Sequence, residues 1–207
     1  MISSLTHILD WLGVIVFAAS GGLVASRKNM DIVGFALLAS VTAIGGGTVR
    51  DVILGLSPVF WVREPAILLI SVSVGALMFF VAHLLQSRMR LLLWLDAIGL
   101  AVFCVTGAHT ALAAGAGPSI AVAMGVASAT FGGIIRDVLG GESPLVLRKE
   151  IYVTAALFGA LVAMLATGLA FDLTTSIVAG FLTAFAIRAA ALTWNLSLPR
   201  YQNQTDL

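Results

Sequence analysis

Residues 45–64 read GGGTVRDVILGLSPVFWVRE, and residues 131–150 read FGGIIRDVLGGESPLVLRKE. Both stretches carry the pattern GGxxRDxxxGxSPxxxxxE, at an offset of 86 residues (132 minus 46). At this offset the segment from Asp10 to Glu64 aligns without a gap with the segment from Asp96 to Glu150. Two unrelated apolar helices rarely share so many glycines, charges and prolines, so the chain contains an internal repeat.

The two copies match at small, charged and aromatic positions. The residues Asp10, Gly13, Phe17, Gly21, Gly46, Gly47, Arg50, Asp51, Gly55, Ser57, Pro58 and Glu64 pair in that order with Asp96, Gly99, Phe103, Gly107, Gly132, Gly133, Arg136, Asp137, Gly141, Ser143, Pro144 and Glu150. The repeat therefore includes the residues that could carry chemistry.

The composition places this repeat in a membrane. Hydrophobic residues make up 60% of the 207 residues and charged residues 10%, against roughly 45–50% and ~25% in soluble domains. The polar residues are bunched, so the apolar stretches between them are long enough to cross the ~30 Å hydrocarbon layer. The predicted spans are Ile8–Ala25, Ile32–Leu54, Ala66–Leu85, Leu91–Ala113, Ser119–Leu139, Ile151–Phe171 and Thr174–Trp194.

Each copy of the repeat contains three predicted spans. Because three is an odd number, the second copy must enter the membrane from the opposite side, and the repeats are inverted. The sequence therefore predicts an all-α membrane protein with seven transmembrane helices, in two inverted three-helix repeats plus a final helix. The predicted units are residues 1–90, residues 91–172, and residues 173–207 with the seventh helix and a cytoplasmic tail.

The basic residues of the loops predict the orientation. One side of the predicted topology carries Arg27, Lys28, Arg88, Arg90, Arg148, Lys149 and Arg200, whereas Arg63 is the one basic loop residue on the other side. Lys and Arg in short loops stay on the cytoplasmic side during insertion. We therefore expect the N-terminus outside and the C-terminus in the cytoplasm.

The first candidate site is the pair of glycine runs, Gly45, Gly46 and Gly47 in the second span and Gly132 and Gly133 in the fifth. A helix that kinks or breaks at glycine exposes backbone carbonyls, which suit a dehydrated monovalent cation. The alternative is that the glycines only allow close helix packing. Two symmetric copies favour kinked helices that line a pore.

The second candidate site is a set of charges that follow the glycines by one turn, namely Arg50, Asp51, Arg136 and Asp137. A charge at the bilayer centre costs about 2.5–3.5 kcal/mol on insertion scales, so these side chains are expected to face protein or water. The topology would bring Asp10 toward Arg50 on one face and Asp96 toward Arg136 on the other. Salt bridges that fix helix ends and charges beside a conduction path are both open interpretations.

The remaining polar residues suggest little chemistry. The acids, histidines and hydroxyls form no nucleophile and base set, so we expect neither an enzyme nor a cofactor. No metal-ligand spacing is present, and no basic run with interleaved aromatics indicates nucleic-acid binding. We interpret His83 and His109 as hydrogen-bonded packing residues. Snorkelling to the cytoplasmic interface explains Arg188 as well as a function does, so Arg188 is assigned no role.

At the two motifs, and over nearly the whole chain, the sequence resembles the prokaryotic TRIC-type channels, relatives of the trimeric intracellular cation channels of animal endoplasmic reticulum. The resemblance implies a homotrimer in a bacterial inner membrane, with a pore in each protomer lined by the kinked second and fifth helices. The expected partners are K⁺, with Na⁺ as a second candidate ion, and membrane lipids. Phe131 replaces the first glycine of the second motif and is expected to narrow the path.

The same bacterial family includes proteins described as glycine transporters. A secondary transporter for glycine or a similar small solute is therefore the alternative function, because inverted repeats commonly serve alternating access. A membrane scaffold without a permeation path is a third hypothesis. Channel and transporter both need helix breaks beside a cavity, so the sequence leaves both open.

Overall fold

The structure is a computed structural model, and it describes residues 4–85, 88–147 and 151–197. It is built from helices. They are α1 (Ser4–Arg27), α2 (Ile32–Ile53), α3 (Phe60–Arg63), α4 (Ala66–Val81), η1 (Ala82–Leu84), α5 (Arg88–Ala113), α6 (Pro118–Leu139), η2 (Leu145–Leu147), α7 (Val153–Gly168) and α8 (Leu173–Trp194).

In the part of the chain that the structure describes, seven apolar helices correspond to the seven predicted spans. Six of them, namely α1, α2, α4 with η1, α5, α6 and α8, are long and apolar enough to cross a membrane. The seventh, α7, is a shorter apolar helix of 16 residues. The short helix α3 was not predicted, and it lies between the second and third spans. The predicted all-α membrane fold is confirmed.

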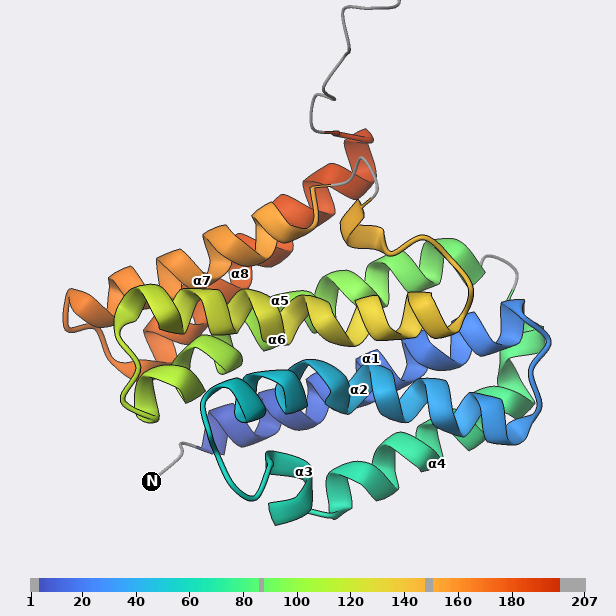
Figure 1. The fold of residues 1–207 in the computed structure, drawn as a ribbon. Helices are drawn as coiled ribbons and strands as arrows, with labels where there is room; N and C mark the ends of the chain where they lie inside the picture. Colours follow the sequence, from blue (N-terminus) through green and yellow to red (C-terminus); the bar gives the residue numbers. More distant parts are fainter. Residues whose placement is uncertain (1–3, 86–87, 148–150, 198–207) are drawn as a thin grey trace, which may run out of the picture.

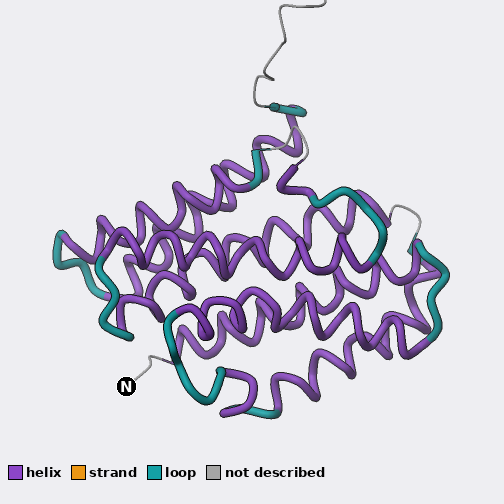
Figure 2. The backbone as a smooth tube through the Cα atoms, viewed as in Figure 1, coloured by secondary structure: helices purple, strands orange, loops and turns teal. Residues whose placement is uncertain are grey.

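The two halves of the bundle use the same helix contacts. In the first half α1, α2 and α4 pack on one another, and in the second half α5, α6 and α7 do the same. Across the halves α1 contacts α5, and α2 contacts α6. These paired helices run in opposite directions, as the sequence colours of Figure 1 show, and Figure 2 shows the loops that join successive helices. The remaining helix α8 packs on α5 and α7 and stands outside the inverted repeats.

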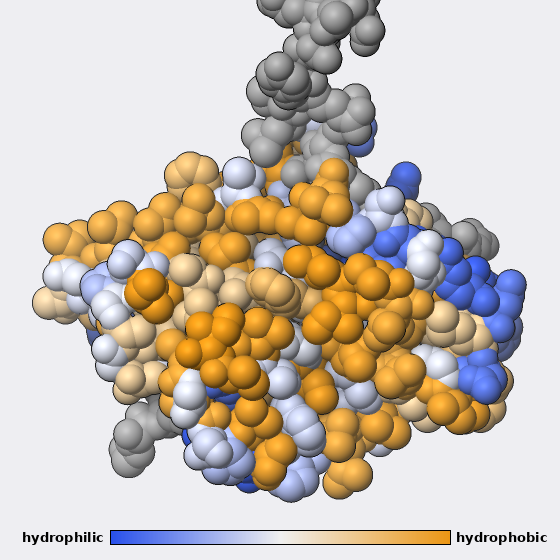
Figure 3. Space-filling view, viewed as in Figure 1, coloured by the Kyte–Doolittle hydropathy of each residue, from blue (hydrophilic) through white to orange (hydrophobic). Residues whose placement is uncertain are grey.

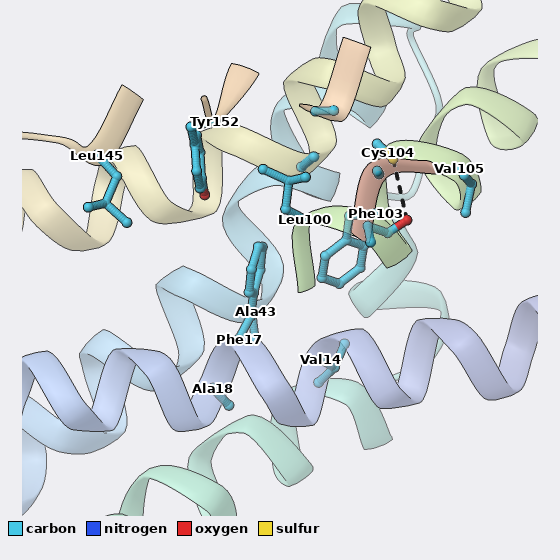
Figure 4. Packing of buried hydrophobic residues seen from close by; sticks show 14 of the residues in the cluster. Val14, Phe17, Ala18, Ala43, Leu100, Phe103, Cys104, Val105, Leu145 and Tyr152 are labelled. Carbon is cyan, nitrogen blue, oxygen red and sulfur yellow. Dashed lines mark hydrogen bonds between the residues drawn. The ribbon is translucent and has the colours of Figure 1, made fainter. Parts of the chain in front are cut away.

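Matched residues of the two copies interlock where α1 meets α5. The rings of Phe17 and Phe103 lie 5.1 Å apart between their centroids (Figure 4). A Cβ on Gly13 would meet the Phe103 ring at 2.9 Å, and a Cβ on Gly99 would overlap the Phe17 ring. Each phenylalanine therefore occupies the space that a glycine leaves open on the other helix, which explains why both residues recur in the repeat.

The helices α2 and α6 cross at the glycine motifs. A Cβ on Gly46 would overlap the carbonyl oxygen of Ser128, and a Cβ on Gly132 would overlap the carbonyl oxygen of Thr42. Both helices continue without interruption through the glycines. In this structure neither helix shows the expected break with exposed carbonyls. The glycine contacts agree with the alternative interpretation, which is close packing of the two helix backbones. Kinked, pore-lining helices stay a prediction.

The remaining motif glycines also face neighbouring side chains. Phe131, which takes the place of a glycine, is 38% exposed at the surface of the protomer, so the narrowing of an internal path by its ring is not observed. At the other motif glycines, an added Cβ would lie nearest to the side chain of Ile135 for Gly45, of Phe60 for Gly47 and of Tyr152 for Gly133.

On the face shown in Figure 3, apolar side chains cover the middle of the bundle and polar side chains gather most clearly at its right-hand end. At the end where α1 finishes, Arg27 Nη2 binds Glu142 Oε2 at 2.6 Å, which joins the last residue of α1 to the segment after α6. The end of the bundle where α1 begins is called the N-terminal face. The end where α1 finishes, with Arg27 and Glu142, is called the opposite face. Arg148, Lys149 and Arg200 lie outside the described residues, and the cytoplasmic orientation stays a prediction.

Candidate functional site

A buried charge cluster lies at the opposite face, at the last turn of α6. Arg136 donates from Nε to Asp137 Oδ1 at 2.9 Å and from Nη1 to Ser20 Oγ at 2.9 Å, and Nη1 also pairs with Asp96 Oδ1. The Tyr152 hydroxyl donates to Asp96 Oδ2 at 2.7 Å. All five side chains are buried. A buried charge is strongly destabilising without a partner, so these residues form one interdependent unit.

Two further residues belong to this region, namely Tyr152, which the sequence analysis missed, and Arg188, to which it gave no role. The guanidinium carbon of Arg188 lies 5.2 Å from the centroid of the Tyr152 ring, and its Nη1 donates to the Ile151 carbonyl oxygen at 3.4 Å. Arg188 is only 1% exposed, so the snorkelling interpretation is wrong. The available signal was a departure from the repeat, since Ala66 stands at the first-copy position of Tyr152.

The matching pair at the N-terminal face is Arg50 and Asp51. Arg50 donates from Nε and Nη2 to Asp51 Oδ1 at 2.8 and 2.7 Å. Asp51 Oδ2 accepts a hydrogen bond from the backbone N–H of Phe60 at 2.8 Å, and Asp137 Oδ2 accepts one from the N–H of Leu145 at 2.9 Å. The aspartate of each motif therefore binds its own arginine and also fixes the turn that follows its helix.

The expected approach of the α1 and α5 aspartates to the arginines occurs in one copy only. Asp96 meets Arg136, as described above. Asp10 forms no ion pair with Arg50, whose guanidinium pairs with the adjacent Asp51. The Asp10 carboxylate instead faces an open cavity. The two pseudo-symmetric ends of the bundle are therefore different in structure.

This cavity has a volume of about 550 Å³ and lies at the N-terminal face, between the start of α1 and the end of α5. The guanidinium of Arg63 lies at the cavity, with Nη2 at 4.0 Å from Asp51 Oδ2. Among the described residues, no group of three or more His, Cys, Asp or Glu side chains could hold a metal ion. The polar side chains that line the cavity are Thr6, Asp10, Arg63, Thr106, His109, Thr110 and Thr167.

The comparisons with known proteins agree with this architecture. A family model described as "Glycine transporter" matches twice, at residues 7–83 and 93–168. A crystal structure of the TRIC trimeric intracellular cation channel orthologue from Rhodobacter sphaeroides matches with a TM-score of 0.92 and 57% identity, over 94% of this chain and 100% of that chain. The chain belongs to the prokaryotic TRIC-type family.

Further relatives support the same assignment. A prokaryotic TRIC channel solved in 0.5 M KCl matches with a TM-score of 0.86 and 34% identity, over 94% of this chain and 98% of that chain. The inner membrane protein YadS of Escherichia coli K12 is 44% identical over 95% of this chain and 96% of its own length. A membrane protein of Vibrio cholerae is 43% identical over 96% of this chain and 84% of its own length.

In this TRIC-type protein the two copies of the family motif therefore have different surroundings. The copy at the opposite face is closed by Tyr152 and by Arg188 from α8. The copy at the N-terminal face lies near a cavity that bears an acidic side chain, Asp10. Any proposed transport mechanism therefore has to explain why one end of the bundle has a buried charge cluster and the other end has a cavity.

Proposed function

We propose that this protein is a monovalent cation channel that conducts K⁺, with one pore in each protomer of a homotrimer. The observation that carries this proposal is the 57% identity, over 94% of the chain, to a structure described as a trimeric intracellular cation channel orthologue. Na⁺ is the second candidate ion. The proposed location is a bacterial inner membrane, in contact with lipids, with the N-terminus outside and the C-terminus in the cytoplasm.

The proposed pore runs beside the crossing of α2 and α6. Gly45, Gly46 and Gly47 with Gly132 and Gly133 allow the two backbones to approach, and an axial bend at these glycines would open the path. Arg50 and Asp51 lie toward one end of this path, and Arg136 and Asp137 toward the other. The acidic Asp10 at the N-terminal face would attract cations and repel anions.

The proposed closed gate is the cluster at the opposite face. Arg136, Asp96 and Tyr152 are buried and hydrogen-bonded to one another, so no ion could pass between them without separating these groups. The cavity at the N-terminal face would stay accessible to water and ions. In this proposal, opening consists of separating the buried cluster.

The test is a planar bilayer recording with purified protein. We expect ohmic unitary currents that reverse near the K⁺ equilibrium potential in a KCl gradient. Replacement of both Gly46 and Gly132 by leucine serves as the inactive control, because both positions contact backbone carbonyls across the helix crossing. The absence of unitary currents from correctly assembled wild-type protein would refute the channel.

The alternative is a secondary transporter for glycine or a similar small solute. Two observations support the transporter, namely the description of the matching family model and the cavity that opens at one face. Inverted repeats with a one-sided cavity are typical of alternating access. Saturable uptake of labelled glycine into proteoliposomes, without unitary currents, would support the transporter over the channel.

A further inference from the structure

The two ends of the α1–α5 pair share a polar core but differ around it. Asp10 and Thr106 at the N-terminal face match Asp96 and Ser20 at the opposite face. Around this core, the N-terminal face has three polar side chains where the opposite face has three apolar ones. The pairs at the 86-residue offset (132 minus 46) are Thr6 with Leu92, His109 with Leu23, and Thr110 with Val24.

The three apolar residues are buried in the hydrophobic core, whereas their polar counterparts line the cavity. On α5, Thr106, His109 and Thr110 share one helix face, because they are spaced by three and four residues. On α1, Thr6 and Asp10 are one turn apart and also line the cavity. Five polar side chains from two helices thus converge on one space, and at three of these five positions the other repeat has a buried apolar residue.

His109 gives an independent indication of a ligand. Its side chain is nine-tenths buried and lines the cavity, and its Nε2 has no hydrogen-bond partner. The hydrogen-bonded packing role expected for this residue is therefore not fulfilled at Nε2. A buried ring nitrogen without a partner is destabilising, so a group that hydrogen-bonds to it from the cavity would be favoured.

We propose that this cavity binds a small protonated primary amine. The amine carries one positive charge and three N–H donors, and the cavity offers the Asp10 carboxylate, threonine hydroxyls and the His109 ring nitrogen as acceptors. A charge-assisted hydrogen bond to Asp10 would supply most of the affinity. The cavity volume of about 550 Å³ leaves room for the amine together with bound water.

The alternatives fit these residues less well. A divalent metal needs several anionic or imidazole ligands, and the described residues include no group of three or more His, Cys, Asp or Glu side chains. An anion would be repelled by Asp10, and the one guanidinium that lines the cavity, Arg63, lies near the Asp51 carboxylate. A cation without N–H donors would leave the His109 nitrogen without a donor.

The functional consequence rests on the proposed channel. An amine bound at the N-terminal face would stand at one mouth of the K⁺ path and reduce the current from that side. Among the described residues, the opposite face offers no equivalent site, because Arg136 neutralises Asp96 and the neighbouring positions are apolar. The block is therefore expected from one side of the membrane only.

The experiment measures block of K⁺ current by methylammonium, added first to one side and then to the other side of the same single channel. Tetramethylammonium is the matched probe, because it has the same charge and no N–H donor. We expect methylammonium to block from one side, and about tenfold or more weaker block by tetramethylammonium. Equal block by both ions, or equal block from both sides, would overturn the proposal.

Variants of the chain connect the block to the cavity. Asp10→Asn and His109→Leu should each weaken the methylammonium block about tenfold relative to the variant's own unblocked current. Asp31→Ser is the control, since Asp31 is an exposed carboxylate at the start of α2 and serine retains the N-cap. An unchanged block in both cavity variants would refute the site.

A second measurement does not need a current. Saturation-transfer NMR of methylammonium with the protein in nanodiscs should give a signal in wild type that falls in Asp10→Asn and His109→Leu. If wild type carries no current but shows this signal, the channel is refuted and the binding site stands. If wild type carries current but shows neither signal nor sided block, the binding site is refuted and the channel stands.

Discussion

At the residue scale, the carbonyl oxygens of Ser128 and Thr42 lie where a Cβ on Gly46 or Gly132 would be. We expect Gly46→Ala and Gly132→Ala each to destabilise the protein by about 1–3 kcal/mol, because backbone atoms have to move apart. Thermal unfolding of the solubilised protein measures this loss. Gly168→Ala is the control, because no atom lies within 4 Å of its added Cβ. Equal melting temperatures for all three variants would contradict the close helix crossing.

Removal of the Tyr152 hydroxyl, a single oxygen atom, should have a measurable effect on the open probability of the channel. Tyr152→Phe removes the 2.7 Å hydrogen bond to Asp96 and keeps the ring that faces Arg188. The buried carboxylate then lacks one donor, which costs about 1–3 kcal/mol in the closed arrangement. We predict a higher open probability in bilayer recordings, by about tenfold for a change of 1.4 kcal/mol.

The control for this prediction is Thr183→Val in α8. The Thr183 hydroxyl donates to the Ala179 carbonyl of its own helix at 2.8 Å, so its removal takes away a hydrogen bond within one helix and leaves the buried cluster unchanged. Similar open probabilities for wild type, Tyr152→Phe and Thr183→Val would show that the buried cluster is not the gate.

At the element scale, α8 stands outside the repeats and yet reaches the cluster of the second repeat. The guanidinium of Arg188 faces the Tyr152 ring, and a buried cation–π contact contributes about 2 kcal/mol. We therefore expect Arg188→Met to raise the open probability in the same direction as Tyr152→Phe. A double-mutant cycle measures whether α8 acts through Tyr152, since residues in one network give non-additive effects. Strictly additive effects would mean that α8 does not hold the tyrosine.

The start of α8 gives a pH-dependent prediction. The Thr175 hydroxyl and backbone N–H donate to the exposed Asp172 carboxylate at 2.6 and 3.0 Å, and these bonds hold the pKa of Asp172 below its ordinary value. Because the folded pKa is lower than the unfolded one, the cap is fully stabilising above the unfolded pKa of about 4. Its contribution disappears as the pH falls through the folded pKa.

We therefore expect Asp172→Ala to lower the melting temperature at neutral pH, and the difference from wild type to shrink as the pH falls below about 4. Asp172→Asn is the control, because the amide oxygen still caps the helix and does not titrate. A difference between wild type and Asp172→Ala that is constant down to strongly acidic pH would contradict the capping role.

At the scale of the whole molecule, the proposed assembly consists of three copies of the chain, each with its own pore. Several side chains of α4 are more than half exposed on the protomer, including Leu69, Leu77 and Phe80, as expected for a surface that faces lipid or another protomer. Native mass spectrometry after release from mild detergent should give three times the mass of one chain. A stable monomer with full unitary conductance would contradict the homotrimer and leave the pore within each protomer intact.

The sequence by itself determined the class of fold and its inverted symmetry. Hydrophobic length decides whether a helix can cross a membrane, and an odd number of spans in each copy fixes the inversion. The motif residues Gly46, Gly132, Arg136 and Asp96 were found because they recur at one offset. Their recurrence also predicted the approach of Asp96 to Arg136, which the structure shows.

Only the tertiary structure decided how these residues are used. The glycines keep their helices continuous and make contact through backbone carbonyls, because side-chain size and helix crossing are set by the neighbouring helix. Arg50 pairs with Asp51 and not with Asp10, and the packing of α8 places Arg188 against the Tyr152 ring. Hydrophobicity and repetition are properties of one segment or of two aligned segments, whereas the partner of a buried charge depends on distances between helices that only packing fixes.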